Sequence, residues 1–126
     1  MRVFTERSDI NAVAFSPDGR YLVSGDDAKI LAVRSFRTGN VTKSYSDHDD
    51  DVNTVAFSNN GRWICSGGDD RKLMVREVST GKIKVIKTGF SGKLLSVQFS
   101  PNDEFIATGC SGRKVCILKT SNGELV

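Results

Sequence analysis

Short apolar runs alternate with turn residues along the whole chain. In its middle third they predict four strands, at Val52–Phe57, Trp63–Gly67, Lys72–Glu77 and Ile83–Lys87. The segments between them are rich in Ser, Asn and Gly, which favour tight reversals of the backbone. No stretch has the periodicity of an amphipathic helix. The pattern therefore predicts a small antiparallel sheet.

The same pattern occurs three times. Val13–Ser16 recurs as Val55–Ser58 and as Val97–Ser100, each time 42 residues further along the chain. Self-similarity at a fixed period of this length indicates a repeat architecture in which each unit is one supersecondary element. We place the repeats at residues 8–49, 50–91 and 92–126, and residues 1–7 before them.

First and third strands carry apolar residues on both faces, as in Ile30–Val33 and Val115–Leu118. A sheet with one solvated face would alternate apolar and polar residues instead. Four-stranded sheets that bury both faces are typical of propeller blades arranged around an axis, and a β-sandwich is the less favoured arrangement. Three aromatic residues at the repeat period are expected in the core: Phe15, Phe57 and Phe99.

Composition narrows the function classes. The 126 residues are 38% hydrophobic and 26% charged, which is typical of a soluble globular protein, and no apolar run is long enough for a membrane span or a signal peptide. We therefore expect an intracellular protein, cytoplasmic or nuclear. Cys65, Cys110 and Cys116 are expected to be packed, reduced thiols. Their spacing and the single histidine disfavour zinc, and no cofactor is expected.

Several segments together resemble the WD40 repeat family over all 126 positions. They are the period of 42 and the segments Val13–Arg20, Ser66–Asp70 and Ser79–Lys82. The resemblance implies an all-β fold of three four-stranded antiparallel propeller blades. The Trp-Asp pair that usually ends the third strand is replaced by Arg34-Ser35, Arg76-Glu77 and Leu118-Lys119.

Many WD40 blades contain a buried network of His, Ser or Thr, Asp and Trp. The resemblance assigns His48, Ser66 and Asp70 to it in the middle repeat, with Arg76 at the tryptophan position. We expect a structural histidine rather than a general base or metal ligand, because no nucleophile or second ligand is indicated nearby. Arg76 is expected to pair with Asp69, Asp70 or Glu77, or to lie along apolar surface with its head in water.

The other repeats lack most of this network. They hold Glu6 and Phe90 at the histidine position, and Ala28 and Gly112 at the aspartate position. Without these polar groups, the first and third blades are expected to rely on packing alone.

Three blades form an incomplete ring, since a closed propeller needs roughly four to eight. Met1–Thr5 are expected to be the outer strand of a preceding blade, and the third blade is expected to lack most of its own. The ring would close by head-to-tail association, with a six-blade dimer favoured over a nine-blade trimer. The alternative is that the chain is a natural or engineered fragment of a larger propeller used for self-assembly.

Loops are where propellers bind partners. Lys29, Arg71 and Arg113 occupy one equivalent turn position, where they could form a basic arc for acidic or phosphorylated segments. A loop at one end of the middle blade carries four more candidates for partner binding: Asp47, Asp49, Asp50 and Asp51. The alternative to partner binding is that these charged side chains are simply exposed to solvent and keep the blades soluble.

The function expected from these features is a non-catalytic scaffold for protein or peptide partners. The alternative is a reader of phosphopeptides, phospholipids or nucleic acid, although nucleic acid is disfavoured because the acidic loop would repel phosphates. No enzyme is expected, since the sequence has no nucleophile motif, phosphate-binding glycine loop or paired carboxylates at a defined pocket.

Overall fold

The computed structural model describes residues 1–126 and consists of strands and turns. No helix in it is long and apolar enough to cross a membrane. Its eleven strands are β1 (Ile10–Phe15), β2 (Tyr21–Asp26), β3 (Leu31–Ser35), β4 (Val41–Tyr45), β5 (Val52–Phe57), β6 (Trp63–Gly68), β7 (Leu73–Glu77), β8 (Ile83–Lys87), β9 (Leu94–Phe99), β10 (Phe105–Cys110) and β11 (Lys114–Lys119).

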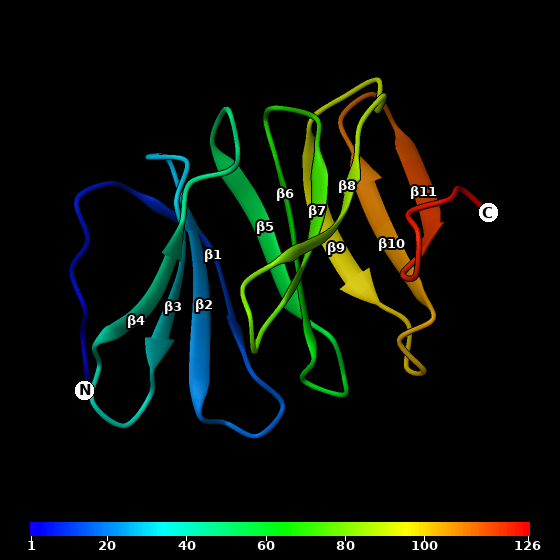
Figure 1. Cartoon of the computed structure of the whole chain (residues 1–126). Helices are drawn as coiled ribbons and strands as arrows, with labels where there is room; N and C mark the ends of the chain where they lie inside the picture. Colours follow the sequence, from blue (N-terminus) through cyan, green and yellow to red (C-terminus); the bar gives the residue numbers. More distant parts are fainter.

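The strands form three separate antiparallel sheets, which confirms the predicted propeller blades. The first blade has the order β1-β2-β3-β4, the middle blade β5-β6-β7-β8 and the third blade β9-β10-β11. Figure 1 shows them side by side in chain order. In the third blade, the fourth strand is reduced to one bridge between Leu118 and Leu125.

Equivalent turns explain why each sheet reverses where it does. In the middle blade, the Ser58 hydroxyl donates to Asn60 Oδ1 at 2.6 Å and accepts from Trp63 N at 2.9 Å. Gly61 completes the turn with a φ of 73°, a left-handed value that glycine adopts without steric cost. The third blade places Asp103 at that position with a φ of 61°. Local chemistry thus sets the β5–β6 reversal.

The core lies between blades rather than inside any one of them. One apolar cluster joins the first and middle blades through residues such as Val23, Val52 and Ile64, and a larger one joins the middle and third blades through residues such as Cys65, Leu94 and Ile106. The middle blade therefore buries both faces. Burial of these side chains against neighbouring sheets is the main stabilising term.

Some expectations differ from the structure. The predicted strands of the middle repeat match within one residue, since β6 extends to Gly68 and β7 begins at Leu73. Phe15 was expected in the core but is 60% exposed, because no blade covers that face of β1. Met1–Thr5 form no strand, because no neighbouring strand pairs with them in the single chain.

Candidate functional site

One end of the blades gathers the predicted charged residues. The β2–β3, β6–β7 and β10–β11 turns meet there with the β4–β5 and β8–β9 linkers, at the top of Figure 1. The β3–β4 and β7–β8 turns lie at the opposite end, because the strands are antiparallel. We describe the first end as the candidate binding face.

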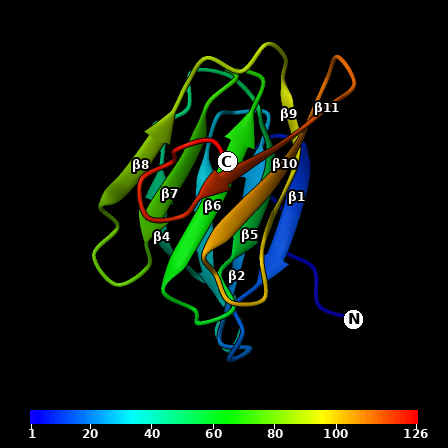
Figure 2. The ribbon, with the colours of Figure 1, turned by 90° about the vertical axis from the view of Figure 1, so that its right-hand side faces the viewer.

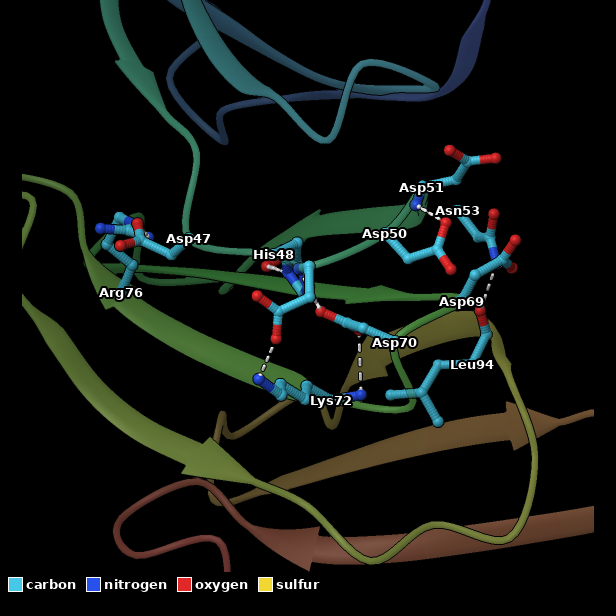
Figure 3. Close-up of polar contacts among 12 residues, drawn as sticks. Asp47, His48, Asp50, Asp51, Asn53, Asp69, Asp70, Lys72, Arg76 and Leu94 are labelled. Atoms are coloured by element: carbon cyan, nitrogen blue, oxygen red, sulfur yellow. Dashed lines mark hydrogen bonds and ion pairs between the residues drawn. The ribbon is translucent and has the colours of Figure 1, made fainter.

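His48 is the anchor of the β4–β5 linker. Its Nδ1 lies 2.8 Å from Asp70 Oδ2, and its Nε2 lies 2.8 Å from Ser66 Oγ. Asp70 Oδ2 also accepts a bond from Asp49 N at 3.0 Å, and Asp70 Oδ1 accepts one from Lys72 N at 3.1 Å. The structure thus brings His48, Ser66 and Asp70 together, and the network ties the linker to the β6–β7 turn (Figure 3).

The Ser–His–Asp connectivity is that of a catalytic triad. The exposure of these side chains therefore decides whether the three residues form a catalytic site or a structural network. The His48 and Asp70 side chains are each 3% exposed, and Ser66 is buried between β5 and β7. A serine nucleophile must reach a substrate carbonyl, which this burial prevents. Both histidine nitrogens are hydrogen-bonded within the blade, so neither is available to bind a metal ion.

Arg76, at the tryptophan position, does not pair with Asp69, Asp70 or Glu77 as expected. Its buried guanidinium forms an ion pair with Asp47, whose side chain is 43% exposed, and Nη1 donates to Gly81 O at 2.8 Å. The same group lies 3.9 Å from the ring centroid of Tyr45, a residue of the preceding blade. The expectation was wrong because the side chain reaches back across the blade boundary instead of along its own sheet.

The first blade repeats this arrangement with different residues. Arg34 forms an ion pair with Glu6, donates to Gly39 O at 2.6 Å and lies 4.8 Å from the Phe4 ring centroid. The expectation that this blade relies on packing alone is therefore wrong. Comparison at the 42-residue offset missed the aromatic partner, because Phe4 aligns with Ser46 and not with Tyr45.

The linker aspartates differ in how they are engaged. Asp49 forms an ion pair with Lys72, which lowers the pKa of Asp49 and raises that of Lys72. Loss of hydration and the carboxylates of Asp27, Asp50 and Asp69 raise the pKa of Asp51. This raised pKa indicates a concentration of negative charge beside the linker.

Carboxylate oxygens of Asp50, Asp51 and Asp69 lie within 4.8 Å of one another. Asp69 accepts a bond of 2.6 Å from Asn53 Nδ2, and Asp50 Oδ1 accepts one of 2.8 Å from Asp51 N (Figure 3). Asp69 also lies 3.4 Å from Lys93 Nζ. The cluster is thus tied to neighbouring donors, and its exposed part favours a cationic side chain as a contact.

Lys29, Arg71 and Arg113 occupy equivalent positions in the three turns between second and third strands. All three are exposed, and none takes part in an ion pair within the chain. Their φ angles are 67°, 61° and 68°, in the left-handed region that costs a non-glycine residue roughly 1 kcal/mol. Three free cations are therefore held by the same unusual backbone geometry on one face.

Cys65 and Cys110 lie in surroundings that disfavour the thiolate form. Burial raises the pKa of Cys65, and loss of hydration is also the first cause of the raised pKa of Cys110. All three cysteines are free. A thiolate nucleophile requires the opposite shift.

A family model described as "WD domain, G-beta repeat" matches residues 1–31, 39–76 and 82–118. Two solved structures, described as "Structure of U3-55K" and "Crystal structure of RRP9 WD40 repeats", are similar to the chain with TM-scores of 0.92 and 0.91 at 16% identity. Each comparison covers 98% of this chain and 39% of the solved one. No curated protein sequence matches significantly.

The family match covers most of the chain, and the two solved structures share its fold of radiating four-stranded sheets. Proteins of this family are generally non-catalytic scaffolds that bind other proteins. Because the family model matches three successive repeats over most of the chain, the chain belongs to the WD40 repeat family.

Proposed function

We propose that the chain is a non-catalytic scaffold that binds protein or peptide partners through the candidate binding face. The observation that carries the proposal is the triplet of unpaired basic residues, Lys29, Arg71 and Arg113, at one position of three equivalent turns. Left-handed backbone at non-glycine residues is costly and is often found at binding sites. The burial of Ser66 and His48 supports the absence of catalysis.

The basic residues would receive acidic or phosphorylated segments through charge-assisted hydrogen bonds. Beside them, Asp47 and Asp49 hold the linker through Arg76 and Lys72, which leaves Asp50 and Asp51 to contact a basic partner residue. A partner with both signs of charge would therefore fit this face best. Association would be steered by charge and weakened by salt.

The alternative function is a reader of generic polyanions such as phospholipid headgroups or nucleic acid. Free cations on one face favour it, and the Asp50–Asp51–Asp69 carboxylates oppose it by repelling phosphates. A polyanion reader would lose affinity steeply with salt for any polyanion, whereas a protein scaffold would discriminate among peptides of equal charge.

Peptide binding tests the proposal. The chain and its Arg71→Glu/Arg113→Glu variant are titrated with matched acidic, phosphorylated and basic peptides and with heparin as a generic polyanion. We expect the variant to bind the acidic and phosphorylated peptides at least tenfold more weakly. Arg37→Glu/Lys82→Glu reverses two exposed charges at the opposite end and is the matched control. Equal binding by both variants would refute a role for the basic turns.

Two further properties belong to the proposal. The three unpaired thiols support a protein that works inside the cell, in the cytoplasm or nucleus, since reducing compartments keep cysteines free. We also propose that one partner is a second copy of the chain, associated head to tail.

A further inference from the structure

The two ends of the blade stack carry open faces of opposite kinds. Here "knob face" means the side of a blade that packs on the preceding blade, and "notch face" the side that packs on the following one. The middle blade buries both. The first blade leaves its knob face open, and the third blade leaves its notch face open, the face toward the viewer in Figure 2.

The two internal boundaries use one packing device. A Cβ placed on Gly25 would lie 2.5 Å from Val52 Cγ1, and one on Gly67 would lie 2.9 Å from Leu94 Cβ. The glycine of one blade is thus a notch, and the aliphatic side chain of the next blade fills it. Val52 and Leu94 are both fully buried as a result.

The equivalent glycine of the third blade and the equivalent aliphatic residue of the first blade do not make this contact within the chain. Gly109 follows Gly25 and Gly67 at the repeat period, and a Cβ on it would meet only Ser96 Oγ, at 2.9 Å. Ile10 precedes Val52 and Leu94 at the same period and is 41% exposed. An open notch and an exposed knob therefore stand at opposite ends of one molecule.

The surrounding apolar residues follow the same rule. On the knob face, Val13 is 66% exposed, whereas its equivalent Val55 is buried against the first blade. On the notch face, Val115 and Ile117 are exposed, whereas their equivalents Leu73 and Val75 are buried against the third blade. Both open faces therefore have the composition of a buried blade boundary.

One hydrogen bond across an internal blade boundary also has equivalent residues on the two open faces. Thr54 Oγ1 accepts a bond of 3.0 Å from Val97 N across the boundary between the middle and third blades. Ser96 is the equivalent of Thr54 on the open notch face, and Val13 is the equivalent of Val97 on the open knob face. The Ser96 hydroxyl can therefore accept from Val13 N of another molecule. One bond cannot be repeated, because Leu95 replaces Asn53, whose amide bonds Leu94 O.

The segment before β1 makes contacts with the first blade that resemble those at an internal blade boundary. Residues of this segment, Phe4 and Glu6, contact Arg34 as Tyr45 and Asp47 contact Arg76 at the internal boundary. It therefore lies where the outer strand of a preceding blade ends. In the third blade, β11 has only the Leu118–Leu125 bridge on its outer edge, and such an edge is a template for strand pairing.

We infer that the knob face of the first blade docks on the notch face of the third blade of a second copy. This rests on the proposed protein-binding role and names the partner for these two faces. The contact is heterologous, so it closes into a ring when the rotation permits. Two copies give six blades, within the range of roughly four to eight for known propellers.

Sedimentation of the 126-residue chain over a range of concentrations tests the inference. We expect a species of twice the 13.7 kDa protomer mass. Val13→Asp on the knob face and Gly109→Val in the notch should each weaken association at least tenfold, because one buries a charge and the other fills the pocket. Ile86→Asp is the matched control, since Ile86 is 52% exposed on β8, outside both faces.

Mixing the two variants gives the sharper result. Each retains one intact face, so together they should form a one-to-one pair and nothing larger, while neither pairs with itself. A folded wild-type chain that stays monomeric at all concentrations would overturn the inference, as would a Val13→Asp variant that associates like the wild type. The Arg71→Glu/Arg113→Glu variant should assemble normally, so failure of the loop proposal and failure of this one are distinguishable.

Discussion

The middle and third blades share the arrangement of their first three strands but are stabilised by different contacts. The middle blade buries a polar network of His48, Ser66 and Asp70, and Arg76 pairs across its boundary with the first blade. The third blade has Phe90, Thr108, Gly112 and Leu118 at those positions. There Phe90 and Leu118 pack in the larger apolar cluster.

The difference shows that the members of a buried network depend on one another for their hydrogen bonds. Thr108 keeps the hydroxyl but loses the histidine, so its Oγ1 is buried without a hydrogen-bond partner, and the nearby Cys110 thiol is a poor substitute. Ser66, with a histidine present, is satisfied. Apolar replacement of only some members therefore leaves a buried polar atom unsatisfied, at a cost in stability.

The largest effect is expected where the middle blade meets the third. Gly67→Val would force side-chain atoms into Leu94 and Thr54, at 2.9 Å and 3.2 Å from a Cβ, and should cost about 3 kcal/mol of unfolding free energy. Gly109→Val places the same side chain on the open notch face and should cost far less. Urea unfolding at a concentration where the chain is monomeric measures both. Equal losses would mean that the boundary packing is not what distinguishes the two blades.

Arg76→Leu installs the third blade's residue in the middle blade. It leaves Asp47 and the carbonyl of Gly81 without their shared partner, so we expect a loss of about 2–3 kcal/mol of unfolding free energy. The control is Arg62→Leu, which breaks an exposed pair with Glu77 at 3.8 Å and should cost at most about 1 kcal/mol. Thermal unfolding of the two variants would contradict this reasoning if Arg62→Leu were the more damaging.

His48→Phe installs the third blade's other replacement. Ser66 and Asp70 then keep buried polar atoms without the imidazole, and the expected loss is about 2 kcal/mol. Adding Ser66→Ala should recover part of this loss, which a double-mutant cycle measures. The reverse change, Phe90→His, should bring no gain because Gly112 offers no carboxylate. A gain would show that the network needs fewer members than proposed.

Thr108→Val removes the buried hydroxyl that has no hydrogen-bond partner in the third blade. Replacing it with a methyl group of similar shape removes an unsatisfied polar atom and should raise the unfolding free energy by about 1 kcal/mol. Ser66→Ala in the middle blade should lower it by a similar amount, since that hydroxyl has a partner. Calorimetric melting temperatures of the pair should therefore move in opposite directions. Movement in the same direction would remove the contrast between the blades.

Strand positions and the repeat were predictable because they depend on local chemistry. Alternation of apolar runs with Ser, Asn and Gly turns located the strands of the middle blade within one residue, since turns such as Ser58–Gly61 are closed by their own side chains. The His48–Ser66–Asp70 contacts could be anticipated from a family pattern. No periodicity in the sequence would have located them, because the three residues come from different segments.

What the sequence by itself determined is therefore the unit: a four-stranded sheet of 42 residues whose two faces both require cover. Only the tertiary structure decided which groups meet between units. Arg76 pairs with Asp47 and not with Asp69, Asp70 or Glu77. Phe15, which was expected in the core, is exposed. Both outcomes depend on what lies beyond the edge of the blade, because an ion pair or a buried ring is defined by its neighbour in space and not by its own residue type.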